Sequence, residues 1–196
     1  MFQDILLTSF QVWRADQPSN ASDDLLQIVG ATYPQLSTLR FLRRLPVHFE
    51  QAPQQVIEAI EAYKPAAVVC CGMGEPRHKL GLESTAVGET RAIHSPLPLP
   101  ALQKGLSTTE ISHDAGRFVC NRLYYDVLSH LQNHSGTFGL FIHVPRLTPQ
   151  NCSAIAADFT QVLDRLNDLL FNLRPNHPVA IPRPYPPSQP LLKRAS

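Results

Sequence analysis

The chain has 196 residues, 43% of them hydrophobic, and a formal net charge of +1. This length suits one well-buried domain, and a net charge so close to zero indicates neither nucleic acid nor a membrane surface as a partner. No stretch approaches the ~20 apolar residues of a membrane span, and the amino end lacks the pattern of a secretory leader. We therefore expect a cytoplasmic protein.

The first half of the chain alternates between strand-like and helix-like patterns. Residues 3–10 predict a short buried strand, and the cap-like Ser22 with acidic neighbours precedes a helical apolar pattern. Residues 38–47 predict a second strand, residues 54–63 a helix, and residues 66–71 a buried strand followed by glycines. Such alternation predicts an α/β fold with a mostly parallel sheet covered on both faces, and it places the chemistry at the carboxyl ends of the strands.

The second half predicts further strands at residues 80–87, 107–112 and 137–144. Thr148 and Pro149 then look like the cap and first position of a helix. Its apolar residues follow at spacings of 4, 3, 4, 3 and 4, namely Ile155, Phe159, Val162, Leu166, Leu169 and Leu173. A coiled coil is the alternative, but about three heptads is a short run, so we expect this helix to pack against the sheet.

The last segment, residues 174–196, holds seven prolines in 23 residues. Proline removes backbone donors and favours extended conformations, so we predict a disordered tail after a single domain of residues 1–173. Its "PPSQP" stretch also fits a ligand of a proline-binding groove, although a solvated tail is the simpler interpretation.

The four cysteines are Cys70, Cys71, Cys120 and Cys152. Two of them are adjacent, so the spacing matches neither a disulfide framework nor a structural zinc site, and we expect free thiols. Cys120 lies in "AGRFVCNRLYY", where Gly116 offers a tight turn and a helical pattern begins at about the cysteine. A helix amino end lowers the pKa of a thiol, so Cys120 is a candidate nucleophile, with a role as core filler as the alternative.

Two further residues are candidates for a catalytic site. His143 lies at the carboxyl end of the strand predicted at 137–144, where it would be either a general base or a histidine satisfied by backbone hydrogen bonds. Glu83 is an acid within an apolar strand-like stretch, where it would either orient a histidine or lie on the solvent face of an edge strand.

Three segments together resemble a known family. "SHDAGRFVCNRLYY", "GLFIHVPRL" and "LGLESTAV" are similar to the cysteine, histidine and glutamate motifs of the pyroglutamyl peptidase I family, in the same chain order. "DILLTSF" and "YKPAAVVCCGMGEPR" resemble its first strand and the strand and turn before the glutamate. The resemblance runs from about residue 3 to 173 and is interrupted near 92–106.

The resemblance implies a fold, a reaction and roles for three residues. The fold would be a three-layer α/β sandwich around a twisted, mostly parallel sheet. The reaction would remove the pyroglutamyl group from a small peptide with a blocked amino terminus through a thioester acyl-enzyme, with no metal or cofactor. Cys120 would be the nucleophile, His143 the general base and later acid, and Glu83 the residue that orients His143. Relatives often form dimers or tetramers, which makes a homo-oligomer an expectation here.

The resemblance also implies a pocket for the lactam ring. Phe10 and Trp13 align with an aromatic pair of the family that walls this pocket, although packing of an aromatic strand end would explain them too. Arg77 matches an arginine in the glycine-rich turn and would shape the site or the oxyanion pocket, with a solvated loop arginine as the alternative.

The chain departs from the family in its specificity elements. The family loop reads approximately TGF, any residue, PFGG, where this chain has "TSFQVWRA". Bulkier residues than glycine predict another path for this loop. Gly88 replaces an asparagine, and residues 94–105 are shorter than the substrate-side hairpin and helix of the family. Two alternatives therefore stay open, namely a related cysteine amidase for another small acyl group and a catalytically idle homologue that acts in protein association.

Overall fold

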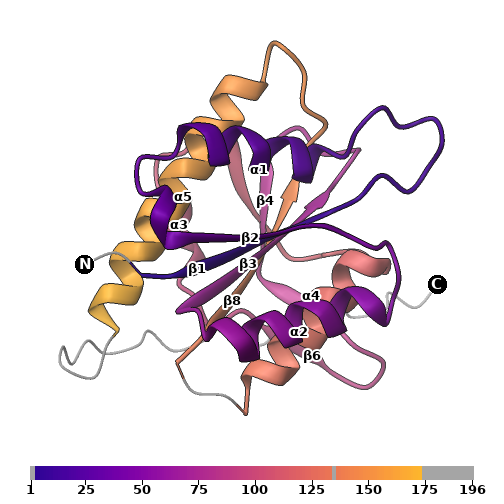
Figure 1. The fold of residues 1–196 in the computed structure, drawn as a ribbon, viewed down its shortest axis with the longest axis vertical. Coiled ribbons are helices and arrows are strands. Elements are labelled where there is room, and N and C mark those ends of the chain that lie inside the picture. Colours follow the sequence, from indigo (N-terminus) through magenta and orange to yellow (C-terminus); the bar gives the residue numbers. More distant parts are fainter. Residues whose placement is uncertain (1–2, 134–135, 174–196) are drawn as a thin grey trace, which may run out of the picture.

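The computed structural model describes residues 3–133 and 136–173, which form one α/β domain with a six-stranded sheet between layers of helices (Figure 1). The strand order is β2-β1-β3-β8-β4-β7. The strands are β1 (Ile5–Phe10), β2 (Leu39–Leu45), β3 (Ala67–Met73), β4 (Leu80–Glu83), β7 (Thr109–Ser112) and β8 (Phe138–Val144). Every neighbouring pair is parallel except β4 and β8. The predicted fold class is confirmed.

The helices cover both faces of this sheet and enclose two hydrophobic clusters. One cluster takes residues from α1 (Ala21–Thr32), α3 (Leu99–Gln103) and α5 (Cys152–Asn172). The other takes residues from α2 (Gln51–Tyr63), α4 (Val119–Leu131) and the hairpin of β5 (Thr85–Val87) and β6 (Ala92–His94). A short 3-10 helix, Leu36–Thr38, precedes β2. Successive residues of one strand enter opposite clusters, as Leu6 and Leu7 do, because side chains alternate along a strand.

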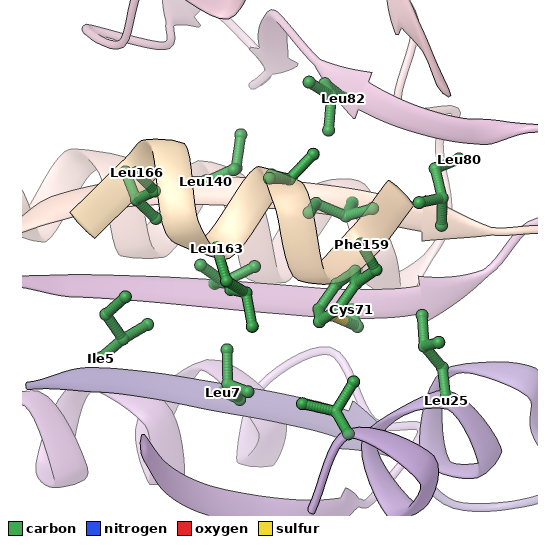
Figure 2. Packing of buried hydrophobic residues seen from close by; sticks show 14 of the residues in the cluster. Ile5, Leu7, Leu25, Cys71, Leu80, Leu82, Leu140, Phe159, Leu163 and Leu166 are labelled. Atoms are coloured by element: carbon green, nitrogen blue, oxygen red, sulfur yellow. The ribbon is translucent and has the colours of Figure 1, made fainter. Parts of the chain in front are cut away.

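Helix α5 buries an apolar stripe against the sheet, as its spacing predicts (Figure 2). The fully buried members include the predicted Ile155, Phe159, Val162 and Leu166. Leu163 and Leu170 are also buried, whereas Leu169 is only partly buried and Leu173 is the C-cap. The buried face of α5 is wider than the 4, 3, 4, 3 spacing alone predicts. A helix that packs on a sheet buries a broader stripe of its surface than a helix in a coiled coil does.

The sequence places two helix starts incorrectly. Thr148 and Pro149 precede α5, whose N-cap is Asn151. Thr148 instead forms a turn in which its N–H donates to Asn151 Oδ1 (2.8 Å) and its Oγ1 accepts from Asn151 N–H (3.3 Å). In α1 the N-cap is Asn20, whose Oδ1 accepts from the backbone N–H of Ser22 (3.0 Å), so Ser22 lies inside the first turn.

The stretch predicted as one strand at residues 80–87 is two strands in different sheets. β4 pairs with β7 and β8, whereas β5 pairs with β6 in a separate hairpin. The chain changes partner at Ser84, which donates to the carbonyl of Ser112 and accepts from the N–H of Ser95, both at 2.8 Å. The structure also adds β6 and α3 within residues 92–106, for which the sequence predicts no element.

Other predictions concern the chain as a whole. All four cysteines carry free thiols. The helices within residues 3–133 and 136–173 include none whose length and hydropathy would suit a bilayer crossing. The tail predicted at residues 174–196 lies outside the described residues and stays a prediction.

Candidate active site

His143 and Glu83 meet across the one antiparallel strand pair of the described sheet. In the register of β4 and β8, Gly81 lies opposite His143, and Glu83 lies two residues further along the same face of β4. The carboxylate reaches the ring diagonally, with His143 Nδ1 2.6 Å from Glu83 Oε1. Both residues are buried, at 6% and 0% exposure. A carboxylate accepts hydrogen bonds only, so Nδ1 carries the proton and Nε2 remains available as a base.

Arg77 occupies the space that Gly81 leaves beside His143. Its Nη2 donates to the same Glu83 Oε1 at 2.7 Å and to Ser112 Oγ at 2.9 Å. A Cβ atom at Gly81 would come within 2.7 Å of this guanidinium, and one at Gly74 within 2.8 Å of the Arg77 side chain. Arg77 is therefore a mostly buried partner of Glu83 and not a solvated loop residue.

Glu83 is anchored from a second side as well. The hydroxyl of Tyr124 on α4 donates to its backbone carbonyl at 2.9 Å. Its Oε2 is buried and has no hydrogen-bond partner among the described residues. The carboxylate thus directs one oxygen, Oε1, at both the imidazole and the guanidinium, which fixes the orientation of the ring.

Cys120 is the second residue of α4, and its sulfur lies against the sheet. Gly116 turns the chain with φ +78°, and the N-cap residue Phe118 offers no side-chain hydrogen bond to the first turn. A Cβ atom at Gly72 would come within 2.6 Å of Cys120 Sγ. Gly72 is the register partner of His143 between β3 and β8, and paired residues of parallel strands face the same way. The sulfur, which lies over β3, and the imidazole of β8 are therefore on the same face of the sheet.

The sulfur lies in surroundings that favour the protonated thiol. Burial, followed by the charge of Glu83, raises the pKa of Cys120 to about 12, although a hydrogen bond from its own backbone N–H lowers it. The sequence predicts a lowered pKa at this helix amino end, and burial outweighs that effect. Deprotonation consequently requires a base beside the thiol.

A pocket of about 330 Å³ opens over these residues. Five of the six residues predicted for the site line it, namely Phe10, Trp13, Arg77, Cys120 and His143. Glu83 does not line the pocket and lies behind His143. The sequence analysis missed Phe118 and Val47, which also line it. An apolar residue two positions before a nucleophile candidate, at the start of its helix, was the available signal for Phe118.

Phe10 and Trp13 form different parts of this pocket. Phe10 is 2% exposed and belongs to a hydrophobic cluster, so it both packs in the core and borders the pocket. Trp13 is 50% exposed, and its ring lies 5.2 Å from that of Phe118, measured between centroids. Trp13 is therefore a rim residue and not a core residue.

The altered loop after β1 is held by side chains. Arg14 Nη2 donates to Glu75 Oε1 at 2.8 Å, and Gln17 Nε2 donates to the same oxygen at 3.2 Å. Asn20 Nδ2 donates to the carbonyl of Gln11 at 3.1 Å and closes the loop at its other end. Polar contacts thus fix a loop in which the family uses glycines.

The absence of a side chain at Gly88, where the family has an asparagine, has a steric explanation in this chain. A Cβ atom there would come within 2.4 Å of the Tyr125 ring. Tyr125 consequently occupies the space that a side chain at position 88 would need.

As for metal sites, the described residues hold no group of three or more His, Cys, Asp or Glu side chains arranged to bind an ion.

Comparison with known proteins identifies similar sequences. The family model described as pyroglutamyl peptidase matches residues 83–161. A pyrrolidone-carboxylate peptidase of Vibrio vulnificus strain YJ016 is 29% identical over 176 residues, which cover 76% of this chain and 81% of the relative. A pyrrolidone-carboxylate peptidase of Brachyspira hyodysenteriae is 30% identical over 135 residues, which cover 55% of this chain and 67% of the relative.

Solved structures of similar fold carry related names. The pyrrolidone carboxyl peptidase of Thermococcus litoralis matches with a TM-score of 0.75 at 20% identity, covering 92% of this chain and all of that one. Pyroglutamyl peptidase I of Bacillus amyloliquefaciens matches with a TM-score of 0.70 at 20% identity, covering 82% of this chain and 95% of that one. At this identity the likeness concerns the fold.

Proposed function

Because the chain belongs to the pyroglutamyl peptidase family of cysteine-type peptidases, we propose that it removes an amino-terminal pyroglutamyl residue from peptides. The observation that carries the proposal is the 2.6 Å hydrogen bond between Glu83 and His143 on the face of the sheet where the Cys120 sulfur lies. A thiol, an imidazole and a carboxylate in this order are the parts of a cysteine hydrolase.

In the proposed mechanism, His143 Nε2 takes the proton of the Cys120 thiol. The pKa of about 12 keeps this thiol protonated otherwise, so the imidazole is essential. Glu83 stabilises the imidazolium that results, because its carboxylate accepts from Nδ1–H. The thiolate then attacks the pyroglutamyl carbonyl carbon, and a tetrahedral intermediate forms.

The first turn of α4 is suited to the negative oxygen of this intermediate. Its backbone N–H groups, that of Cys120 among them, have no side-chain cap, and the positive end of the helix lies there. As the intermediate collapses, His143 gives its proton to the departing amine and a thioester remains on Cys120. Water, deprotonated by His143, then attacks the thioester, which releases pyroglutamate and restores the thiol.

The pocket supports a small, uncharged acyl group. Its volume of about 330 Å³ is at the lower end for ligand pockets, and Phe10 and Trp13 supply aromatic surface for a flat lactam ring. Its charged lining residues already have partners in the protein: Arg77 is paired with Glu83, Glu75 with Arg14, and Asp114 accepts from the N–H of Gly116. These features favour the lactam over an acyl group that carries a charge.

The test compares hydrolysis of a fluorogenic pyroglutamyl amide by the wild type, Cys120→Ser and Cys152→Ser. Cys152 is a matched control, because it is also a partly exposed cysteine at the start of a helix but does not line the pocket. We expect Cys120→Ser to lose at least about a thousandfold in kcat, as removal of a nucleophile does, and Cys152→Ser to keep wild-type activity.

Two other outcomes would replace the proposal. The altered loop around Trp13 motivates a related cysteine amidase for another acyl group. That function would show as acylation of Cys120 by other small amides, detected by mass spectrometry, with no pyroglutamyl hydrolysis. A Cys120 thiol that no amide acylates would indicate the idle homologue.

A further inference from the structure

A second hollow adjoins the pocket of the proposed active site. It measures about 850 Å³ and lies between the end of β5, the start of α4 and Phe49, which lies in the turn before α2. Phe118 lines both the pocket and this hollow, so its side chain borders the two. The proposed reaction at Cys120 assigns no role to this hollow.

Three exposed aromatic side chains run from the pocket to the hollow, and we call them the aromatic ledge: Trp13, Phe118 and Phe49. The Phe118 ring lies 5.2 Å from Trp13 and 5.6 Å from Phe49, the latter edge to face. They are 50%, 44% and 45% exposed. Large aromatics gain free energy by burial, so three of them in contact on the surface indicate a binding site for an apolar group.

The hydrogen bonds around the ledge hold it in place. His48 Nδ1 accepts from the N–H groups of Glu50 (3.2 Å) and Gln51 (3.3 Å), which fixes the turn that carries Phe49. On the far wall, the Asn121 side chain bonds both the N–H (2.8 Å) and the carbonyl (2.7 Å) of Val87. Both sides of the hollow are thus tied to the helices that flank the site.

The position of the sulfur gives the direction of a bound peptide. Phe118 precedes Cys120 by two residues, and under the proposed function the acyl group enters the pocket that Trp13, Phe118 and Cys120 line. The departing amine begins at the scissile carbonyl, and each residue of an extended chain advances about 3.5 Å. On this geometry the first residue of the leaving peptide would lie at the ledge, and the next ones would enter the hollow.

We propose that the aromatic ledge and the hollow bind the leaving peptide and select a large apolar or aromatic side chain at its first residue. This inference rests on the proposed function and adds the substrate class on the leaving side. The charges of the hollow give no competing preference, because Arg117 and Arg122 are balanced by Glu89 and Asp126, and Arg122 is already paired with Asp126 at 2.6 Å.

The first test measures kcat/KM for two peptides that differ only after the pyroglutamyl residue, one with Phe and one with Gly there. In the wild type we expect the Phe peptide to be the better substrate. In Phe49→Ala the ratio of the two kcat/KM values should fall about threefold to tenfold, as the loss of one aromatic contact predicts. Phe171→Ala, which removes a similarly exposed phenylalanine on α5, should leave the ratio at its wild-type value.

The second test separates binding from turnover. In Cys120→Ala, the affinity for each peptide is followed by the fluorescence of Trp13, the only tryptophan of the chain. Tighter binding of the Phe peptide than of the Gly peptide, with a smaller difference when Phe49→Ala is added, would support the inference. Absence of pyroglutamyl hydrolysis in the wild type would count against the proposed function alone and would leave this inference standing.

An equal kcat/KM for both peptides in the wild type would overturn the inference while pyroglutamyl hydrolysis stands. A preference that Phe49→Ala leaves unchanged would overturn it too, because the selection would then arise elsewhere.

Discussion

At the residue scale, the raised pKa of Cys120 predicts that its reactivity depends on His143, the proposed base. With a pKa of about 12, only on the order of 10⁻⁵ of the thiol is ionised at pH 7 without a base. We predict that in His143→Ala the alkylation of Cys120 by iodoacetamide is slower than in the wild type at pH 7. Its rate should then rise roughly tenfold per pH unit, because the thiolate fraction does so below the pKa.

Mass spectrometry would follow this alkylation, with the partly exposed Cys152 as an internal reference. A Cys120 that reacts in the variant as fast as in the wild type at pH 7 would contradict the prediction.

Arg77 is a positioning residue in the proposed mechanism, because it would influence the reaction through Glu83. Its hydrogen bond to Glu83 holds the carboxylate that orients His143. Loss of a hydrogen bond to a charged group costs about 1.5–3 kcal/mol. We therefore predict that Arg77→Gln lowers kcat for a pyroglutamyl amide about tenfold to a hundredfold, and that Arg77→Lys recovers part of it. Steady-state kinetics with circular dichroism as a folding control would test this, and an Arg77→Gln enzyme of wild-type activity would refute it.

The candidate residues of the site could be chosen from their motifs, but the contacts between them could not. The patterns around Glu83, Cys120 and His143 identify three candidates. That Arg77 pairs with Glu83 depends on the absence of side chains at Gly74 and Gly81, which lie on two segments. Contacts of this kind arise only when the sheet forms, and no local pattern encodes them.

At the scale of elements, strand β3 and helix α4 approach each other closely at Gly72 and Cys120. A Cβ atom at Gly72 would lie 2.6 Å from Cys120 Sγ and 2.9 Å from the Phe141 ring. We predict that Gly72→Ala displaces the sulfur and lowers kcat at least about tenfold, while it lowers the free energy of unfolding by only about 1–3 kcal/mol.

The matched control for this change is Gly30→Ala in α1, where the nearest atom to a new Cβ would be 3.8 Å away. This substitution should raise the free energy of unfolding by about 0.5–1 kcal/mol, since alanine is the better helix former, and leave kcat unchanged. Denaturant unfolding and kinetics of both variants give the comparison. Equal effects of the two substitutions on kcat would contradict it.

Most elements were predictable from periodicity, whereas their partners were not. The pattern across residues 80–87 correctly predicts extended backbone. It does not indicate that the chain leaves one sheet for the other at Ser84. Helix α3 has five residues, with Pro98 as its N-cap and Pro100 as its second residue, and is too short for a helical period to show. The reversed direction of β4, which brings Glu83 inward to His143, likewise follows from tertiary pairing.

At the scale of the whole molecule, Asp23 joins the first two strands and the first helix. From α1 it accepts from Ser9 Oγ on β1 (2.7 Å) and from Arg43 Nε on β2 (2.8 Å). Burial raises the pKa of Asp23, but the hydrogen bonds from Arg43 and Ser9 outweigh it, and the pKa lies below its ordinary 3.8. A lowered pKa stabilises the fold above pH ~3.8, and this contribution is lost as the pH falls through the lower, folded-state value.

We therefore predict that the free energy of unfolding falls more steeply below about pH 4 in the wild type than in Asp23→Asn. Denaturant titrations from pH 2 to pH 7 would measure both curves. Asp168→Asn, an exposed acid on α5, serves as the control and should follow the wild type. Parallel curves for the wild type and Asp23→Asn would contradict the prediction.

Other whole-molecule expectations from the sequence stay predictions. A cytoplasmic location, a dimer or tetramer, and a domain that ends at residue 173 concern surroundings or segments beyond the described residues. These expectations rest on general tendencies of composition and on the resemblance to the family. The strand pairing and packing of the described sheet do not depend on any of them.

The strand order also affects how the protein is made. β8, the last of the described strands in chain order, lies between β3 and β4 in the interior of the sheet. During synthesis on the ribosome, β4 and β7 emerge before the strand that joins them to β3, so the sheet closes only after residue 144 has left the exit tunnel. The same strand carries His143, so under the proposed mechanism an unfinished chain holds the Cys120 thiol without its base.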